Sequence, residues 1–158
     1  MTTPADFLRA LVASAVLAIG FAVAAAAQGD TPAQAAIRAA LTQWMADFNA
    51  GKADKVCDLF ASDVVAQYRG QPERGYDALC DLLKRSLGDH SKNYRYALAI
   101  KEILVEGDVA VVRLTWTLTV RGKDAVGETT VEEPGMDVFR RQNDGAWKIS
   151  RYLAYESP

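Results

Sequence analysis

Apolar residues recur at intervals of three and four in three stretches of the first half of the chain. The spacing predicts helices over residues 33–48 and 76–87, with a shorter helix over about 53–60 between them. The first helix has a strong start, because Thr31 can cap it and Gln34 can reach back to complete a capping box. The N-terminal half is therefore expected to contribute three helices.

After residue 92 the pattern changes from helical to alternating, which is typical of half-buried strands. The phase slips near Lys101-Glu102 and predicts a bulge there. A brief strand is also expected over 63–68, between the second and third helices. Four long strands joined by hairpins are expected over residues 94–105, 109–121, 127–142 and 147–155.

Three helices followed by hairpin-connected strands indicate an α+β domain, in which a mainly antiparallel sheet must wrap its apolar face around the helices. The 158 residues suffice for one such domain. Half of the residues are apolar and about a quarter are charged, which excludes wholesale disorder.

The first 27 residues have the pattern of a secretory signal peptide. Residues 10–27 carry no charge, and Ala25-Ala26-Ala27 offers the small residues that signal peptidase requires. Cleavage there would leave a domain over residues 28–158 in a periplasmic or secreted protein, without a membrane attachment. The alternative is an uncleaved anchor, since this uncharged run of 18 residues approaches the roughly 20 that span a bilayer.

Charge and cysteine content narrow the possible functions. A net charge of −2 provides no basic field for nucleic acid. One histidine and two cysteines are too few for the common zinc sites, so no metal is expected. No cofactor is expected either. Cys57 and Cys80 both lie on apolar helical faces, and in an exported domain a disulfide between them is favoured over two buried thiols.

The last predicted hairpin, residues 136–149, has the sequence MDVFRRQNDGAWKI. Together with the helices and long strands it resembles the nuclear-transport-factor-2-like superfamily, in its SnoaL-like (ketosteroid isomerase-like) branch. The resemblance covers residues 31–155. It implies a strongly curved sheet that forms a cone-shaped α+β barrel with the helices, a ligand pocket at the open end, and a homodimer through the outer sheet face.

Asp137 is the candidate catalytic residue. By alternation it shares a face with Phe139, and a carboxylate on an apolar face either finds a partner or has a raised pKa, as a general base requires. Pairing with an arginine or tyrosine, or rotation toward solvent at Pro134-Gly135, would give it a structural role instead. Tyr68 or Tyr76 could donate a hydrogen bond to a ligand carbonyl. The side chains expected to surround a ligand are Trp44, Tyr68, Tyr76, Trp116 and Phe139.

Glu128, Glu132 and Glu133 precede Asp137 and raise the question of a divalent cation. Neighbouring strand residues point to opposite faces, so a solvated acidic edge that discourages strand pairing is the better interpretation. Arg113 and nearby threonines lie on the opposite face from Trp116, a mixed polar surface that suits a dimer interface or simple exposure.

Three functions remain open. The first is an exported domain whose conical pocket binds a small, largely apolar molecule, with catalysis unassigned. The alternatives are an isomerase- or dehydratase-type enzyme that uses Asp137 as general base with a tyrosine donor, and a non-catalytic dimerising module. Fold alone does not choose between them.

Overall fold

The computed structural model describes residues 29–124 and 126–155. This part of the chain has two helices and five strands, and the strands form one curved sheet with the order β1-β5-β4-β3-β2. β1 runs parallel to β5, and the other neighbours are antiparallel. The α+β class and the mainly antiparallel sheet are confirmed, while the predicted signal peptide lies outside the described residues. The elements are α1 (Pro32–Asn49), β1 (Phe60–Tyr68), α2 (Tyr76–Gly88), β2 (Lys92–Glu106), β3 (Val109–Gly122), β4 (Thr129–Arg141) and β5 (Trp147–Ala154).

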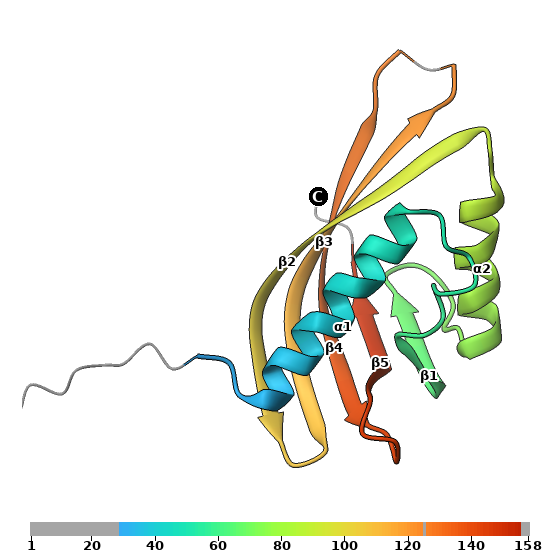
Figure 1. Ribbon diagram of the computed structural model, residues 1–158. Coiled ribbons are helices and arrows are strands. Elements are labelled where there is room, and N and C mark those ends of the chain that lie inside the picture. The colour runs from blue at the N-terminus through green and yellow to red at the C-terminus, as the bar shows by residue number, and fades with distance from the viewer. Residues whose placement is uncertain (1–28, 125, 156–158) are drawn as a thin grey trace, which may run out of the picture.

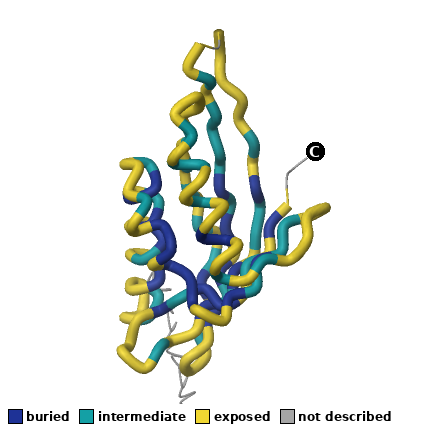
Figure 2. The backbone as a smooth tube through the Cα atoms, turned by 90° about the vertical axis from the view of Figure 1, so that its right-hand side faces the viewer, coloured by how far each residue is buried: buried dark blue, intermediate teal, exposed yellow. Residues whose placement is uncertain are grey.

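The sheet bends around α1, which lies across its concave face, while α2 stands beside β1 (Figure 1). α1 begins with the predicted capping box: the Thr31 hydroxyl accepts from the Gln34 N–H at 3.3 Å, and the Thr31 N–H donates to the Gln34 side chain at 2.8 Å. Buried residues gather where the helices meet the sheet, and the far tips of β3 and β4 are exposed (Figure 2). Within the described residues, no helix is long and apolar enough to cross a membrane.

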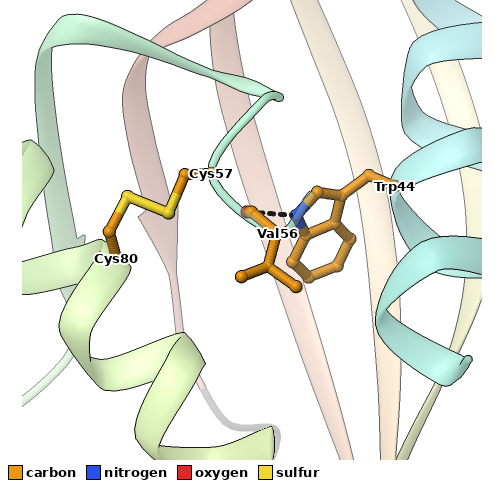
Figure 3. Close-up of a disulfide and its surroundings, with 4 residues drawn as sticks. All are labelled: Trp44, Val56, Cys57 and Cys80. Atoms are coloured by element: carbon orange, nitrogen blue, oxygen red, sulfur yellow. Dashed lines mark hydrogen bonds between the residues drawn. A yellow bond between two sulfur atoms is a disulfide. The ribbon is translucent and has the colours of Figure 1, made fainter. Parts of the chain in front are cut away.

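The predicted helix over residues 53–60 is wrong. The segment forms consecutive turns with hydrogen bonds between residues three apart, such as Asp58 N–H to Lys55 C=O, and β1 begins at Phe60. The Val56 carbonyl accepts instead from the Trp44 indole at 2.8 Å (Figure 3). The Val56 carbonyl is bound by a distant side chain, and β1 begins at Phe60. Too few residues therefore remain in this segment for a stable helix.

The sheet contains the predicted bulge, the predicted glycine turn and one close contact that was not predicted. The register of β2 against β3 shifts between Ile100 and Glu102, which confirms the bulge. Gly145 has a φ of +87° in the turn between β4 and β5, a conformation that favours glycine. At Gly135 in β4, a Cβ atom would stand 2.9 Å from the Leu153 carbonyl oxygen, so only glycine lets β5 approach this closely.

A disulfide joins Cys57 in the turn segment to Cys80 in α2, with their Cα atoms 5.6 Å apart (Figure 3). Both residues are buried. The predicted pairing is therefore confirmed. It fixes α2 to the chain that leads into β1, and both segments contribute to the cavity described next.

Candidate functional site: an aromatic cavity with a buried carboxyl group

A cavity of about 350 Å³ lies between the concave face of the sheet and the two helices. Residues of both helices and all five strands line it, and most of the lining is apolar. Pockets that hold small molecules typically fall between about 300 and 1,000 Å³ and combine an apolar lining with a few polar groups. The cavity therefore has the size and character of a small-molecule site.

Aromatic rings form one wall of the cavity. The Trp44 and Trp116 ring centroids are 5.1 Å apart at 66°, and Tyr96 lies 5.6 Å from Trp116 and 5.0 Å from Phe48. The side-chain amide of Asn49 both donates to and accepts from the Tyr96 backbone at 2.8 Å, which ties α1 to β2. Edge-to-face contacts of this kind hold the rings in a defined arrangement.

Glu133 of β4 brings a carboxyl group into the cavity. It is 5% exposed and stands opposite Trp116 in the β3–β4 register. Burial raises the pKa of the Tyr96 and Tyr152 hydroxyls, and the nearby negative charge of Glu133 raises each further. Both hydroxyls therefore keep their protons at neutral pH and are available as hydrogen-bond donors. Tyr68 of β1 also lines the cavity.

Asp137 lies on the inner face of β4 but is not one of the lining residues. Its side chain is 0% exposed, and neither carboxyl oxygen has a hydrogen-bond partner among the described residues. Burial raises the pKa of this carboxyl well above its ordinary value. Its charge also raises the pKa of Tyr152, its neighbour in the β4–β5 register. Asp137 thus lies behind the cavity wall, and its role as general base stays a prediction.

Of the five predicted ligand-binding residues, some line the cavity and others do not. Trp44, Tyr68 and Trp116 line the cavity. Tyr76 packs against the core and Phe139 is fully buried, both away from the cavity lining. Three of the five side chains are therefore brought together at one site.

Glu133, Tyr96 and Tyr152 are site residues that were not predicted from the sequence. Glu133 was placed on a solvated acidic edge. That assignment is corrected for Glu133 alone: Glu128 and Glu132 are exposed, while Glu133 is buried. The alternation that turns Asp137 inward also turns Glu133 inward, four residues earlier, and this was the available signal. In the described ranges, no three His, Cys, Asp or Glu residues are grouped as metal ligands would be.

The outer face of the sheet exposes several large apolar side chains. Met136 and Leu153, partners in the β4–β5 register, are 45% and 50% exposed, and Leu104 and Tyr155 are exposed as well. Arg113 forms an ion pair with Glu102 on this face at 3.1 Å. The homodimer expected through this surface stays a prediction.

Comparison with solved structures identifies the fold. A ketosteroid isomerase-like protein from Erwinia carotovora atroseptica SCRI1043 is 24% identical and superposes with a TM-score of 0.67, over 82% of this chain and 100% of that one. A conserved protein from Planctomyces limnophilus DSM 3776 is 19% identical with a TM-score of 0.72, over 80% and 97%. A candidate scytalone dehydratase from Novosphingobium aromaticivorans DSM 12444 is 19% identical with a TM-score of 0.69, over 78% and 83%.

At these identities the likeness establishes a shared fold, the nuclear-transport-factor-2-like, cystatin-like fold. No protein with a curated description matches the chain. The model of the SnoaL-like domain family, however, matches residues 41–152, which is well over half of the sequence. The chain belongs to the SnoaL-like domain family.

Proposed function

We propose that this protein binds a small, largely apolar molecule in the cavity between the sheet and the helices. The observation that carries the proposal is a 350 Å³ cavity with aromatic walls and a few polar groups, among them Glu133 and the hydroxyls of Tyr96 and Tyr152. Apolar walls favour burial of the ligand's body, and a small number of polar groups orient it. Two tryptophans in the wall make binding visible by fluorescence.

Filling the cavity tests the proposal. Ala66 of β1 is 4% exposed and lines the cavity, so Ala66→Leu places a larger side chain in the ligand's space. With 4-tert-butylphenol as the probe, we expect the wild type to show saturable quenching of tryptophan fluorescence, and Ala66→Leu to bind at least about tenfold more weakly. That loss corresponds to about 1.4 kcal/mol.

Ala97→Leu is the matched control, because Ala97 is an exposed residue of β2 away from the cavity. Its affinity for the probe should equal that of the wild type. Circular dichroism and the thermal midpoint confirm that each variant is folded, since an enlarged core side chain has a packing cost. Equal affinities in wild type and Ala66→Leu would place binding outside the cavity and refute the proposal.

The same groups support a second candidate function, proton transfer to and from the bound molecule. Glu133 can act as the base, and the protonated hydroxyls of Tyr96 and Tyr152 can donate to a carbonyl oxygen that gains negative charge. Solved structures with this fold include proteins named as isomerase-like or as candidate dehydratases. Reactions of those kinds fit a site with one carboxyl group among hydroxyl donors.

Hydrogen–deuterium exchange tests proton transfer without knowledge of the natural substrate. In D₂O, the wild type should accelerate exchange at the carbon next to the carbonyl of 1-indanone, as observed by proton NMR. Glu133→Gln should reduce that acceleration about 100-fold or more, the usual range for loss of a general base. Glu132→Gln is the control, because Glu132 is the exposed neighbour on the same strand. No acceleration by the wild type would reject catalysis of this kind and leave the binding proposal standing.

We also propose that the protein is exported. The disulfide between Cys57 and Cys80 supports this, because such bonds persist mainly in oxidising compartments. Removal of residues 1–27 by signal peptidase stays a prediction, and the N-terminal sequence of the mature protein would decide it.

A further inference from the structure

The charged and aromatic groups of the cavity are arranged unevenly, and this arrangement has a consequence for the charge of the ligand. Eight of the nineteen lining residues are aromatic. The face of each ring carries partial negative charge, so a ring wall attracts a cation and gives no such attraction to an anion. The attraction is larger where water is excluded. Trp44 and Trp116, whose rings contact each other and that of Tyr96, are both buried.

The charged side chains add to this preference. Two of the lining residues are charged, Glu133 and Arg74. Glu133 is 5% exposed and lies opposite Trp116, so its carboxyl group is on the inner side of the cavity. Arg74 lies in the connection between β1 and α2, is partly exposed, and donates to the Gln71 side chain at 3.4 Å. The acidic group is thus buried among rings, and the basic group stands near the surface.

The tyrosine hydroxyl groups do not reverse this preference for a cation. Burial and the Glu133 charge raise the pKa of Tyr96 and Tyr152, so both hydroxyls stay neutral. Each can donate a hydrogen bond through its O–H and accept one at its oxygen. A ligand with an apolar body and a positive head would meet aromatic rings, neutral oxygens and the Glu133 carboxyl. A ligand with a negative head of the same shape would meet that carboxyl at close range, where the low dielectric strengthens repulsion.

We infer that the cavity selects organic cations, with a quaternary or protonated amine attached to an aromatic or aliphatic body. The inference rests on the proposed binding function and narrows its ligand class. Trp44, Tyr96 and Trp116 supply the ring wall for the positive head, and Glu133 supplies the counter-charge. The apolar lining from α2, including Leu79 and Leu83, contacts the rest of the ligand.

Three probes of nearly identical shape and different charge test this inference. They are 4-hydroxyphenyltrimethylammonium chloride, neutral 4-tert-butylphenol, and sodium 4-hydroxybenzenesulfonate, each titrated into the wild type by calorimetry. We expect the cation to bind at least about tenfold more tightly than the neutral phenol, and the sulfonate to bind most weakly. Glu133→Gln should lower the affinity for the cation about tenfold or more and change that for the neutral phenol less than about twofold.

Each outcome decides a separate question. Equal or tighter binding of the neutral phenol by the wild type would overturn the charge selectivity, while the proposed binding function would stand. Failure of all three probes to bind would count against the binding function itself. Glu132→Gln, an exposed change of the same chemistry on β4, should behave like the wild type. If Glu133→Gln does not fold, the order of the three wild-type affinities still decides the inference.

Discussion

Replacing Asp137 with Asn is expected to stabilise the fold by an amount that grows as the pH rises above about 4. The carboxyl is 0% exposed and makes no hydrogen bond to another described residue, so burial raises its pKa. The native state therefore holds a proton that the unfolded chain releases near the ordinary Asp value of about 3.9. The contribution of the Asp137 carboxyl to the free energy of unfolding is fully present below that value. It is lost as the pH rises toward the raised pKa of the native state.

The size of the effect follows from proton linkage. Between the two pKa values the native state binds one more proton than the unfolded state. Each pH unit in that window lowers the wild-type free energy of unfolding by up to about 1.4 kcal/mol. The amide of the Asp137→Asn variant has no proton to release, so the gap between the variant and the wild type should widen by this amount per unit.

Urea unfolding at a series of pH values between 4 and 8, followed by tryptophan fluorescence, measures this difference in free energy of unfolding directly.

Other carboxyl groups have the opposite pH dependence. The hydrogen bond from Arg38 lowers the pKa of Asp30, and that from Lys52 lowers the pKa of Asp47. Their contributions are present above the unfolded pKa and are lost as the pH falls, but they are common to both proteins and cancel in the difference.

Asp63→Asn provides the control for removal of one negative charge, because Asp63 is an exposed residue of β1. The prediction would be contradicted if the difference in free energy of unfolding between wild type and Asp137→Asn stayed constant from pH 4 to 8. A constant difference would mean that the Asp137 carboxyl has the same proton affinity in the native and unfolded states, and hence that it is not desolvated by the fold.

Local signals in the sequence were sufficient for most elements of this fold. Thr31 and Gln34 form the predicted capping box because both partners lie within one helical turn. The Lys101-Glu102 bulge was visible as a slip in alternation, and the last hairpin as a turn that requires glycine at position 145. In each case the residues that decide the structure are neighbours in the chain.

The features that the sequence did not reveal depend on partners far along the chain. The Val56 carbonyl is engaged by the Trp44 indole, and this contact competes with a helix that the local pattern favoured. β1 pairs in parallel with β5, so Phe60 stands beside Ile149, and no short-range pattern encodes that pairing. The alternation in β4 separates inward Glu133 from exposed Glu132, but only the assembled sheet shows that Glu133 lines a cavity.

Reduction of the bond between Cys57 and Cys80 is expected to lower the free energy of unfolding by about 3 kcal/mol. The bond closes a loop with a sequence separation of 23, and without it the unfolded chain gains conformational freedom. The native state should also change locally. The buried residues of α2 are Leu79 and Cys80, so the helix is held by a narrow apolar contact, of which the disulfide is part.

Because Leu79, Leu82 and Leu83 of α2 line the cavity, a loosened α2 should weaken ligand binding before the rest of the fold is affected. Hydrogen exchange should therefore rise more in residues 76–88 than in β3 after reduction, and the affinity for 4-tert-butylphenol should fall. A Cys57→Ala/Cys80→Ala double variant should show the same losses without reductant and no further change when reductant is added. If complete reduction, verified by counting two free thiols, left the urea midpoint and the exchange of α2 unchanged, the helix would have to be held by its apolar contacts alone.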